Sequence, residues 1–417
     1  MLRAYITVAI YLIVNTANAQ WNLITAEDDS VFFDAVYFTD DSTGFVVGTW
    51  GHNNNPGGVI LKTTDGGLSW DTTIISSLLP ISIHFPSNDT GYVAGSGDSV
   101  LKTVDAGQTW APLKIGEPVN SIFFLDNQIG YASRMNNIIL IKTTDGGLNW
   151  FEDTTIPNLG GSQVFFPSPN TGYIIAGWAI FKTTDGGSNW SKSFIDITDT
   201  TMTTDTSYES IFFVNETLGF IGGSIAIETP FFTNYGVIAK TTDGGLTWNA
   251  KAYPEILRIN SIYFVNASIG YAVGTGTILK TTDGGENWYP QQVTASFKGV
   301  YCTNDTTCYA MSSWPGAIYK TTNGGGPVII GVDNVNSKKE NEVKIYPNPT
   351  TWLITVTGLP KETTRTMVYN ILGELVHRQE LNGSNDPLID LSALPGGLYV
   401  IQLQNRQMTL RKKIIKQ

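Results

Sequence analysis

The chain has 417 residues, with 43 glycines, 12% aromatic residues and only 15% charged residues, so it suits several domains or a repeat architecture better than one ordinary core. Its formal net charge of −11 leaves no basic surface to replace phosphate counterions, which excludes nucleic acid as an expected partner. Residues 1–337 carry 14 Lys and Arg against 29 Asp and Glu, whereas residues 338–417 carry 11 against 7, which indicates a separate C-terminal module.

Residues 1–19 have the pattern of a signal peptide. Arg3 supplies a positive start, an apolar run follows, and Ala17-Asn18-Ala19 forms a small-x-small site, so cleavage is predicted between Ala19 and Gln20. The apolar run is too short to span a bilayer, and no later stretch approaches the roughly 20 apolar residues that a membrane anchor needs. We therefore expect an exported protein with no transmembrane segment after signal removal.

The motif KTTDGGLSW at 62–70 returns along the chain. Seven such boxes begin at the lysines 62, 102, 142, 182, 240, 280 and 320, so the interval is 40 residues except for one of 58. A period near forty with strand-like content predicts a β-propeller with one blade per repeat. The seventh box lacks its tryptophan, because Gly326-Pro327 stands in its place.

Each repeat reads as four strands, which we name a, b, c and d in chain order. Strand a is an aromatic and β-branched run such as VYF at 36–38, strand b starts with Gly and Phe or Tyr, strand c precedes the box, and the box tryptophan opens strand d. Residues 20–332 are thus predicted to form a seven-bladed propeller. Trp21 and the residues after it resemble a strand d, so we expect residues 21–25 to complete the last blade and close the ring.

The aspartate of each box is predicted to be structural. Its carboxylate can accept hydrogen bonds within the c–d turn, and the glycines supply backbone angles that other residues resist. Equivalent aspartates on a ring are a blade-width apart, too far to act on one substrate. This prediction covers Asp65, Asp105, Asp145, Asp185, Asp243 and Asp283.

The boxes resemble the Asp box, or bacterial neuraminidase repeat, with the pattern [ST]-x-D-x-G-x-[ST]-W that Thr63 to Trp70 fits. The KTTDGG form, the Gly-Tyr strand and the seven repeats are most similar to the photosystem II stability/assembly factor family of propellers, over about residues 21–326. The resemblance implies the fold; Asp-box propellers include sialidases, other glycosidases, receptors and assembly chaperones. Sialidases grip their substrate with three arginines, and the mature propeller has only Arg134 and Arg258, so sialidase activity is not expected.

The sequence contains few residue patterns that would indicate another catalytic site or a cofactor site. A glycoside hydrolase or lyase using loop carboxylates remains the alternative to a binding protein, although no spacing pairs Glu117, Glu228 or Glu255. His52 has no accompanying histidine or cysteine, and we predict neither a metal nor a cofactor. Cys302 and Cys308 are the only cysteines, and in an exported protein we expect them to form a disulfide across the a–b hairpin of blade 7.

The loops between strands b and c, which we call the b–c face together with the d–a loops beside them, carry the candidate ligand-binding residues. These are Trp50, Trp178, Trp314, Phe231, Phe232, Tyr235 and Arg134. Aromatic side chains on such loops suit an extracellular glycan or a surface protein. The alternative is that the rings cap the blade cores. We expect a non-catalytic binding propeller, with an adhesin or scaffold subunit as a further possibility.

The C-terminal part follows a polar linker at 333–342. Residues 343–417 alternate as strands and predict a small Ig-like β-sandwich, so the whole chain is expected to be all-β. The segments YPNP (346–349), NILGELV (370–376), LPGGLY (394–399) and KKIIK (412–416) resemble, in order, the type A C-terminal sorting domain of the type IX secretion system of Bacteroidetes. The resemblance implies passage through the periplasm, the type IX machinery as a partner, and release or attachment at the outer cell surface.

Overall fold

A computed structural model describes the chain in two units, residues 1–328 and 329–417. The described residues are 21–25, 28–51, 56–135, 140–153, 161–193, 195, 205–227, 233–253, 256–291, 293, 295–326, 344–347, 350–357, 364–370, 375–381, 387–404 and 409–416. The predicted cleavage site at Ala19 and Gln20 and the predicted linker 333–342 lie outside them, and the domain boundaries stay predictions. No helix among the described residues is long and apolar enough to cross a membrane.

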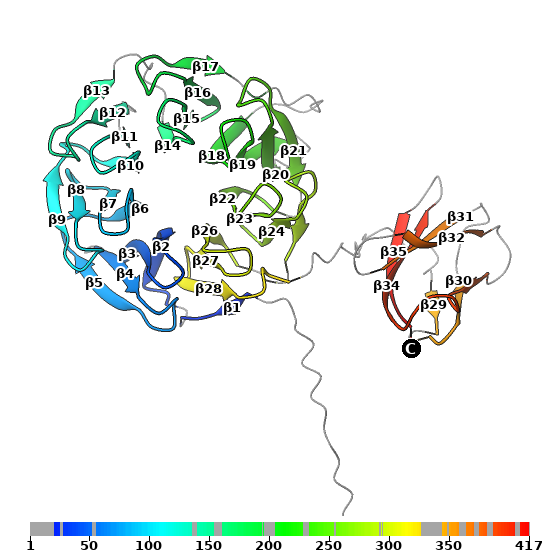
Figure 1. The fold of residues 1–417 in the computed structure, drawn as a ribbon. Helices are drawn as coiled ribbons and strands as arrows, with labels where there is room; N and C mark the ends of the chain where they lie inside the picture. The colour runs from blue at the N-terminus through cyan, green and yellow to red at the C-terminus, as the bar shows by residue number, and fades with distance from the viewer. Residues whose placement is uncertain are drawn as a thin grey trace, which may run out of the picture. The chain divides into compact units, whose positions relative to one another are not determined.

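The first unit is a ring of seven four-stranded antiparallel sheets, as Figure 1 shows. Blade 1 consists of β2 (Val31–Phe38), β3 (Gly44–Trp50), β4 (Gly57–Thr63) and β5 (Asp71–Ile75), and blade 2 of β6 (Pro80–His84), β7 (Gly91–Gly95), β8 (Ser99–Thr103) and β9 (Ala111–Lys114). Blade 3 consists of β10 (Val119–Phe124), β11 (Gly130–Arg134), β12 (Leu140–Thr143) and β13 (Phe151–Asp153). Blade 4 consists of β14 (Gly161–Phe165), β15 (Gly172–Ala176), β16 (Ala179–Thr183) and β17 (Ser191–Ser193). Blades 5 and 6 are β18 (Asp205–Phe213), β19 (Gly219–Ile227), β20 (Thr233–Thr241) and β21 (Asn249–Tyr253); and β22 (Ile259–Phe264), β23 (Gly270–Gly274), β24 (Ile278–Thr281) and β25 (Tyr289–Pro290).

Blade 7 is built from both ends of the propeller. Its strands β26 (Phe297–Cys302), β27 (Cys308–Ser312) and β28 (Ala317–Thr321) are joined by β1 (Asn22–Leu23), which pairs with β28 in the register Asn22 to Lys320. The Ile24 N–H extends this pairing by donating to the Ile318 carbonyl at 2.9 Å. Hydrogen bonds between the first and last strands therefore close the ring, and β1 covers the edge of β28 that would otherwise be exposed.

Neighbouring blades are held together by aromatic stacks. In blades 1 to 6, a phenylalanine at the end of strand a lies on the strand b aromatic of the preceding blade, as Phe124 lies on Tyr92 with ring centroids 3.6 Å apart. Gly130, directly opposite Phe124 in the a–b hairpin, leaves room for this ring, because a Cβ there would lie 2.5 Å from it. The glycine that starts strand b is thus a packing requirement of the repeat.

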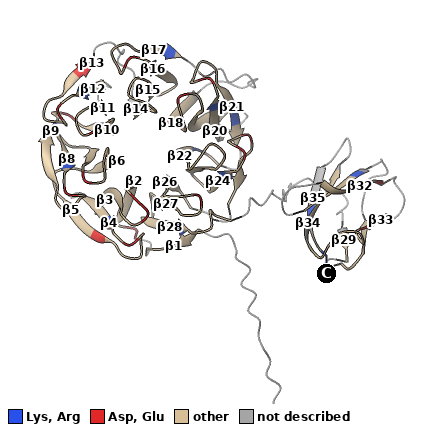
Figure 2. Cartoon of the chain, viewed as in Figure 1, with Lys and Arg blue, Asp and Glu red and all other residues tan. Residues whose placement is uncertain are grey.

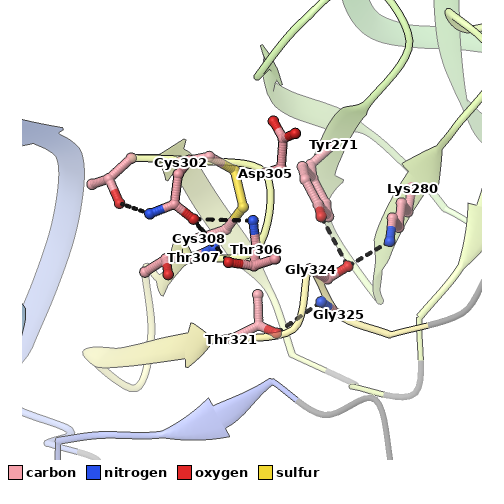
Figure 3. The surroundings of a disulfide bond; sticks show 12 residues. Tyr271, Lys280, Cys302, Asp305, Thr306, Thr307, Cys308, Thr321, Gly324 and Gly325 are labelled. Atoms are coloured by element: carbon pink, nitrogen blue, oxygen red, sulfur yellow. Dashed lines mark hydrogen bonds between the residues drawn. A yellow bond between two sulfur atoms is a disulfide. The ribbon is translucent and has the colours of Figure 1, made fainter. Parts of the chain in front are cut away.

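Blade 7 replaces this Phe–Gly pair with a disulfide. Cys302 and Cys308 occupy the directly opposite positions of the β26–β27 hairpin and are bonded to each other (Figure 3). Both cysteines are buried in the same cluster as Tyr271 of blade 6 and Trp21. The cross-link therefore stands where a phenylalanine ring stands in the other six blades.

Two double variants test whether a Phe–Gly pair can replace the stabilising effect of the disulfide. We expect the C302S/C308S double variant to lose about 2 kcal/mol of unfolding free energy, because the short loop is no longer closed covalently. The C302F/C308G variant restores the pair found in the other blades and should lose less than C302S/C308S in urea unfolding. If C302F/C308G were the less stable of the two, the disulfide would not be a replacement for the stack.

The C-terminal unit contains two antiparallel sheets that share one core. One sheet is β29 (Lys344–Tyr346), β30 (Leu353–Thr357) and β33 (Leu388–Asp390); the other is β32 (Leu375–Leu381), β31 (Thr364–Tyr369), β34 (Gly397–Gln404) and β35 (Thr409–Lys416). Ile354 and Ile389 of the first sheet are buried with Val368 and Ile401 of the second. The final strand carries the KKIIK segment, and the Thr350 N–H donates to its Ile415 carbonyl at 2.8 Å. This arrangement is a small β-sandwich.

Candidate binding face and central cavity

The Asp-box carboxylates are occupied by their own turns. Asp65 accepts hydrogen bonds from the Ser69 hydroxyl at 2.6 Å, the Ser69 N–H at 2.9 Å and the Thr63 hydroxyl at 2.8 Å. These donors, led by the Ser69 hydroxyl, lower the pKa of Asp65 to about 2. The other five boxes repeat the same bonds. Such carboxylates are ionised and already saturated, which suits a turn better than proton transfer.

The lysine and the glycines of the box connect neighbouring blades. Tyr271 and Lys280 of blade 6 both donate to the Gly324 carbonyl of the blade 7 box, at 2.8 and 2.6 Å (Figure 3). Equivalent Tyr and Lys pairs reach the box of the next blade at four other interfaces. Where strand b has Phe220 instead of tyrosine, Lys240 pairs with Glu286. The repeated KTTDGG letters therefore have contacts within the ring.

Two of the predicted tryptophans lie on either side of the junction of blades 7 and 1. Trp50 ends β3 opposite Val31, and Trp314 lies in the β27–β28 turn two residues before Gly316, whose backbone packs against Val31 and exchanges hydrogen bonds with Asp28. The two side chains are 38% and 56% exposed. Both belong to the b–c face, and we call these two exposed side chains the Trp50–Trp314 patch.

Trp178 lies elsewhere on the ring. It follows β15 in blade 4, three blades away from both blade 7 and blade 1, and it is 55% exposed. The Lys192 ammonium stands 4.5 Å from its ring centroid, a cation–π contact within blade 4. The three tryptophans predicted together thus fall in two regions of the ring.

The remaining predicted binding residues differ in their exposure and in the contacts that they already make. Arg134 has a largely buried side chain that pairs with Glu152 at 2.5 Å and with Glu117 at 4.0 Å. Tyr235 is half-buried and packs against the core of blade 5. Phe231, Phe232, His52, Glu228 and Glu255 lie outside the described residues. Among the described residues, no group of three His, Cys, Asp or Glu could hold a metal ion.

The structure contains a cavity of about 690 Å³ on the ring axis, which was not predicted from the sequence. Residues of the inner strands β2, β6, β10, β14, β18, β22 and β26 line it. One aromatic side chain from each of these strands forms a closed ring around the axis: Tyr37, His84, Phe123, Phe165, Phe212, Tyr263 and Tyr301, with neighbouring centroids 4.4–5.6 Å apart. These are the middle letters of the strand a runs, a signal that was visible in the repeats.

Burial shifts the pKa values of the titratable side chains in the aromatic ring. It lowers the pKa of His84 to about 4, so the imidazole is neutral, and its Nδ1 accepts the Phe124 N–H at 3.2 Å. Burial also raises the pKa of Tyr37 to about 12, and its hydroxyl donates to the Phe85 carbonyl at 2.9 Å. The ring therefore carries hydroxyls on blades 6, 7 and 1 and only hydrocarbon rings on blades 3 to 5.

Asp34 also lines the cavity, and its carboxylate is harder to ionise than an exposed one. Burial raises its pKa to about 6, and the nearby Lys298 ammonium acts in the opposite direction. Both side chains line the cavity. Lys and Arg residues are otherwise scattered over separate strands of the described propeller, with no continuous basic stripe (Figure 2).

Two family models match the sequence. The model of the photosynthesis system II assembly factor YCF48 matches residues 13–119 and 231–336, together just over half of the chain. The model of the secretion system C-terminal sorting domain matches residues 344–417. The photosystem II assembly lipoprotein Ycf48 of Synechococcus sp. (strain CC9902) is 29% identical over 168 residues, which are 38% of this chain and 47% of that protein. The chain thus spans about half the length of this curated relative.

Solved propellers resemble the chain in fold. A structure described as YCF48 bound to D1 peptide is 17% identical, with a TM-score of 0.55 over 73% of this chain and 95% of that one. YCF48 from Cyanidioschyzon merolae is 15% identical, with a TM-score of 0.55 over 72% and 98%. A catalytically inactive virginiamycin B lyase from Staphylococcus aureus with quinupristin has the same TM-score at 12% identity, covering 72% and 99%. At these identities the likeness concerns the fold alone.

Proposed function

Because the chain belongs to the family of the photosynthesis system II assembly factor YCF48, we propose that it is a non-catalytic propeller that binds a protein outside the cell. The observation that carries the proposal is the exposed Trp50–Trp314 patch on a rigid ring. Tryptophan is enriched among the residues that contribute most to binding at protein interfaces. A family relative described as bound to a peptide supports a protein ligand over other classes.

The sorting domain sets where this binding takes place. Its match to residues 344–417 implies export by the type IX secretion system, to the cell surface or the extracellular space. With the predicted signal peptide, the route is through the periplasm, and the secretion machinery is a partner of the C-terminal domain. A photosynthetic role does not follow, because the sorting domain is a label of secreted cargo.

A glycan is the second candidate ligand, since exposed tryptophans such as Trp314 also stack on sugars. A secreted glycoside hydrolase or lyase has less support. The six box carboxylates are saturated by their turns, and Arg134 engages Glu117 and Glu152.

The test immobilises the mature chain and exposes it to surface proteins of the exporting bacterium. We expect W50A/W314A to reduce capture of the bound protein at least ten-fold while the melting temperature changes little, because both side chains are exposed. The matched control is L68A/L148A, which removes two exposed apolar side chains from the box turns on the opposite face and should leave capture unchanged.

A polysaccharide panel separates the alternatives. Retention on a polysaccharide that W50A/W314A abolishes would replace the protein ligand with a glycan, and soluble sugar products would replace binding with catalysis. A large drop in melting temperature for W50A/W314A, with capture unchanged, would mean that the rings cap the blade cores and would contradict the proposed face.

A further inference from the structure

Every inner strand of the propeller has a bulge at the same place. The register shifts by one residue at Asp34, Ile81, Asn120, Ser162, Glu209, Asn260 and Lys298, one in each blade. A bulge re-aims its extra residue, and six of these seven line the central cavity; the side chain of Ser162 is not described. The bulged residues form a layer near the start of the inner strands, above the aromatic ring.

The neighbouring positions repeat from blade to blade, but the bulged positions do not. The residue after the bulge is small or polar in every blade, and its side chain commonly accepts an N–H of the next blade, as Ser82 does from Ile122 at 3.2 Å. The bulged residues, by contrast, are acidic, basic, amide and aliphatic in turn. Since the fold does not require one residue type there, these side chains determine what the cavity binds.

Two bulged side chains of opposite charge are left for a ligand. Glu209 is engaged by Arg258 and by the Ser207 hydroxyl, and Asn260 donates to the Phe297 carbonyl at 2.7 Å. The side chains of Asp34 and Lys298 have no hydrogen bond or ion pair with any described residue. They lie on neighbouring blades 1 and 7, and the Lys298 ammonium lowers the pKa of Asp34 against the larger effect of burial.

Opposite this pair the cavity lining is polar at the level of the bulges, where Asn120 and Glu209 lie, and apolar at the level of the aromatic ring. Asp34 and Lys298 stand on the side where the aromatic ring carries the hydroxyls of Tyr37, Tyr263 and Tyr301. On the other side the lining includes Phe123, Phe165 and Phe212. A ligand that fits has a cation and an oxygen acceptor close together, with a hydrocarbon group projecting away from both.

We propose that the central cavity binds an amino-terminal residue with an apolar side chain, either as a free amino acid or at the start of a peptide. The α-ammonium group contacts Asp34, and the α-carboxylate or carbonyl oxygen contacts Lys298. The side chain lies against Phe123, Phe165 and Phe212. A volume of about 690 Å³ holds one to several residues. This site is separate from the Trp50–Trp314 patch and does not depend on the protein partner proposed above.

The test is isothermal titration calorimetry on the mature chain with three probes: L-phenylalanine, the peptide Phe-Ala-Ala, and its N-acetylated form. Acetylation removes the cation, so we expect it to weaken binding of the peptide at least ten-fold. D34N should weaken both free-amine probes at least ten-fold, and K298M should weaken L-phenylalanine more than the peptide, because only the former presents a carboxylate at that position.

The exposed Asp29 on the same blade supplies the matched control, because D29N makes the same charge change outside the cavity and should bind like the wild type. Tighter binding of L-phenylalanine than of Phe-Ala-Ala would identify a free amino acid as the ligand, and the reverse would identify a peptide terminus. Equal binding of the acetylated peptide, unchanged binding by D34N, or no binding of any probe would overturn the proposal.

Discussion

Replacing Trp21 with alanine is expected to lower the free energy of unfolding by about 3–5 kcal/mol, as for other buried tryptophans. Trp21 is 6% exposed and lies edge-on to Tyr271 of the neighbouring blade at 5.8 Å. It precedes the short strand β1, whose pairing with β28 joins the two ends of the ring. Loss of the side chain removes the main apolar contact that holds this strand in place. Urea unfolding of the mature chain, followed by far-UV circular dichroism, measures the effect.

Leu23 is the matched control for Trp21. It belongs to the same closing strand but is 44% exposed, so L23A should change the unfolding free energy by about 0.5 kcal/mol or less. If W21A were as mild as L23A, the ring would not depend on Trp21 for its closure.

Replacing Asp34 with asparagine is expected to stabilise the protein at neutral pH by about 2–3 kcal/mol. Burial raises the pKa of Asp34 from 3.8 to about 6, so the folded protein binds this proton more tightly than the unfolded chain does. The stability contributed by the protonated carboxyl is present below pH 4 and is lost as the pH rises to about 6. Asparagine does not ionise, so the variant lacks this loss. Urea unfolding at pH 4 and pH 7 measures both chains.

Asp65 gives the control of opposite sign for D34N. Its pKa is lowered to about 2 by hydrogen bonds from Ser69 and Thr63, so its contribution is present above pH 4 and is lost as the pH falls. D65N should therefore destabilise the protein at pH 7, whereas D34N stabilises it. A D34N variant that is less stable than the wild type at pH 7 would mean that the carboxylate has a structural partner.

The fold could be predicted because the same strand and turn pattern occurs seven times in the sequence. The period of the boxes indicated the number of blades, and the tryptophan missing after Gly325 pointed to Trp21 at the other end of the chain. The reason for the glycine before each strand b aromatic could not be read from the sequence. It appears only when the Phe124 ring is seen lying over Gly130.

The candidate sites were predicted less completely. The loops that carry Trp50 and Trp314 follow from strand order, but their position on either side of one junction depends on the closure between blades 7 and 1. The central cavity was missed because the apolar letters of the strand a runs do not show which side chains face the ring axis. The bulge at Asp34 and its counterparts has no sequence signature, since the shift depends on pairing with strand b.

A crosslinking experiment shows which face of the propeller contacts the partner. A photoreactive amino acid replaces either Trp314 on the b–c face or Leu68, which is 85% exposed on a box turn of the opposite face. Both chains are irradiated with surface proteins of the exporting bacterium. We expect a defined protein adduct from position 314 and none from position 68. An adduct only from position 68, or equal adducts from both, would contradict a binding propeller that uses its b–c face.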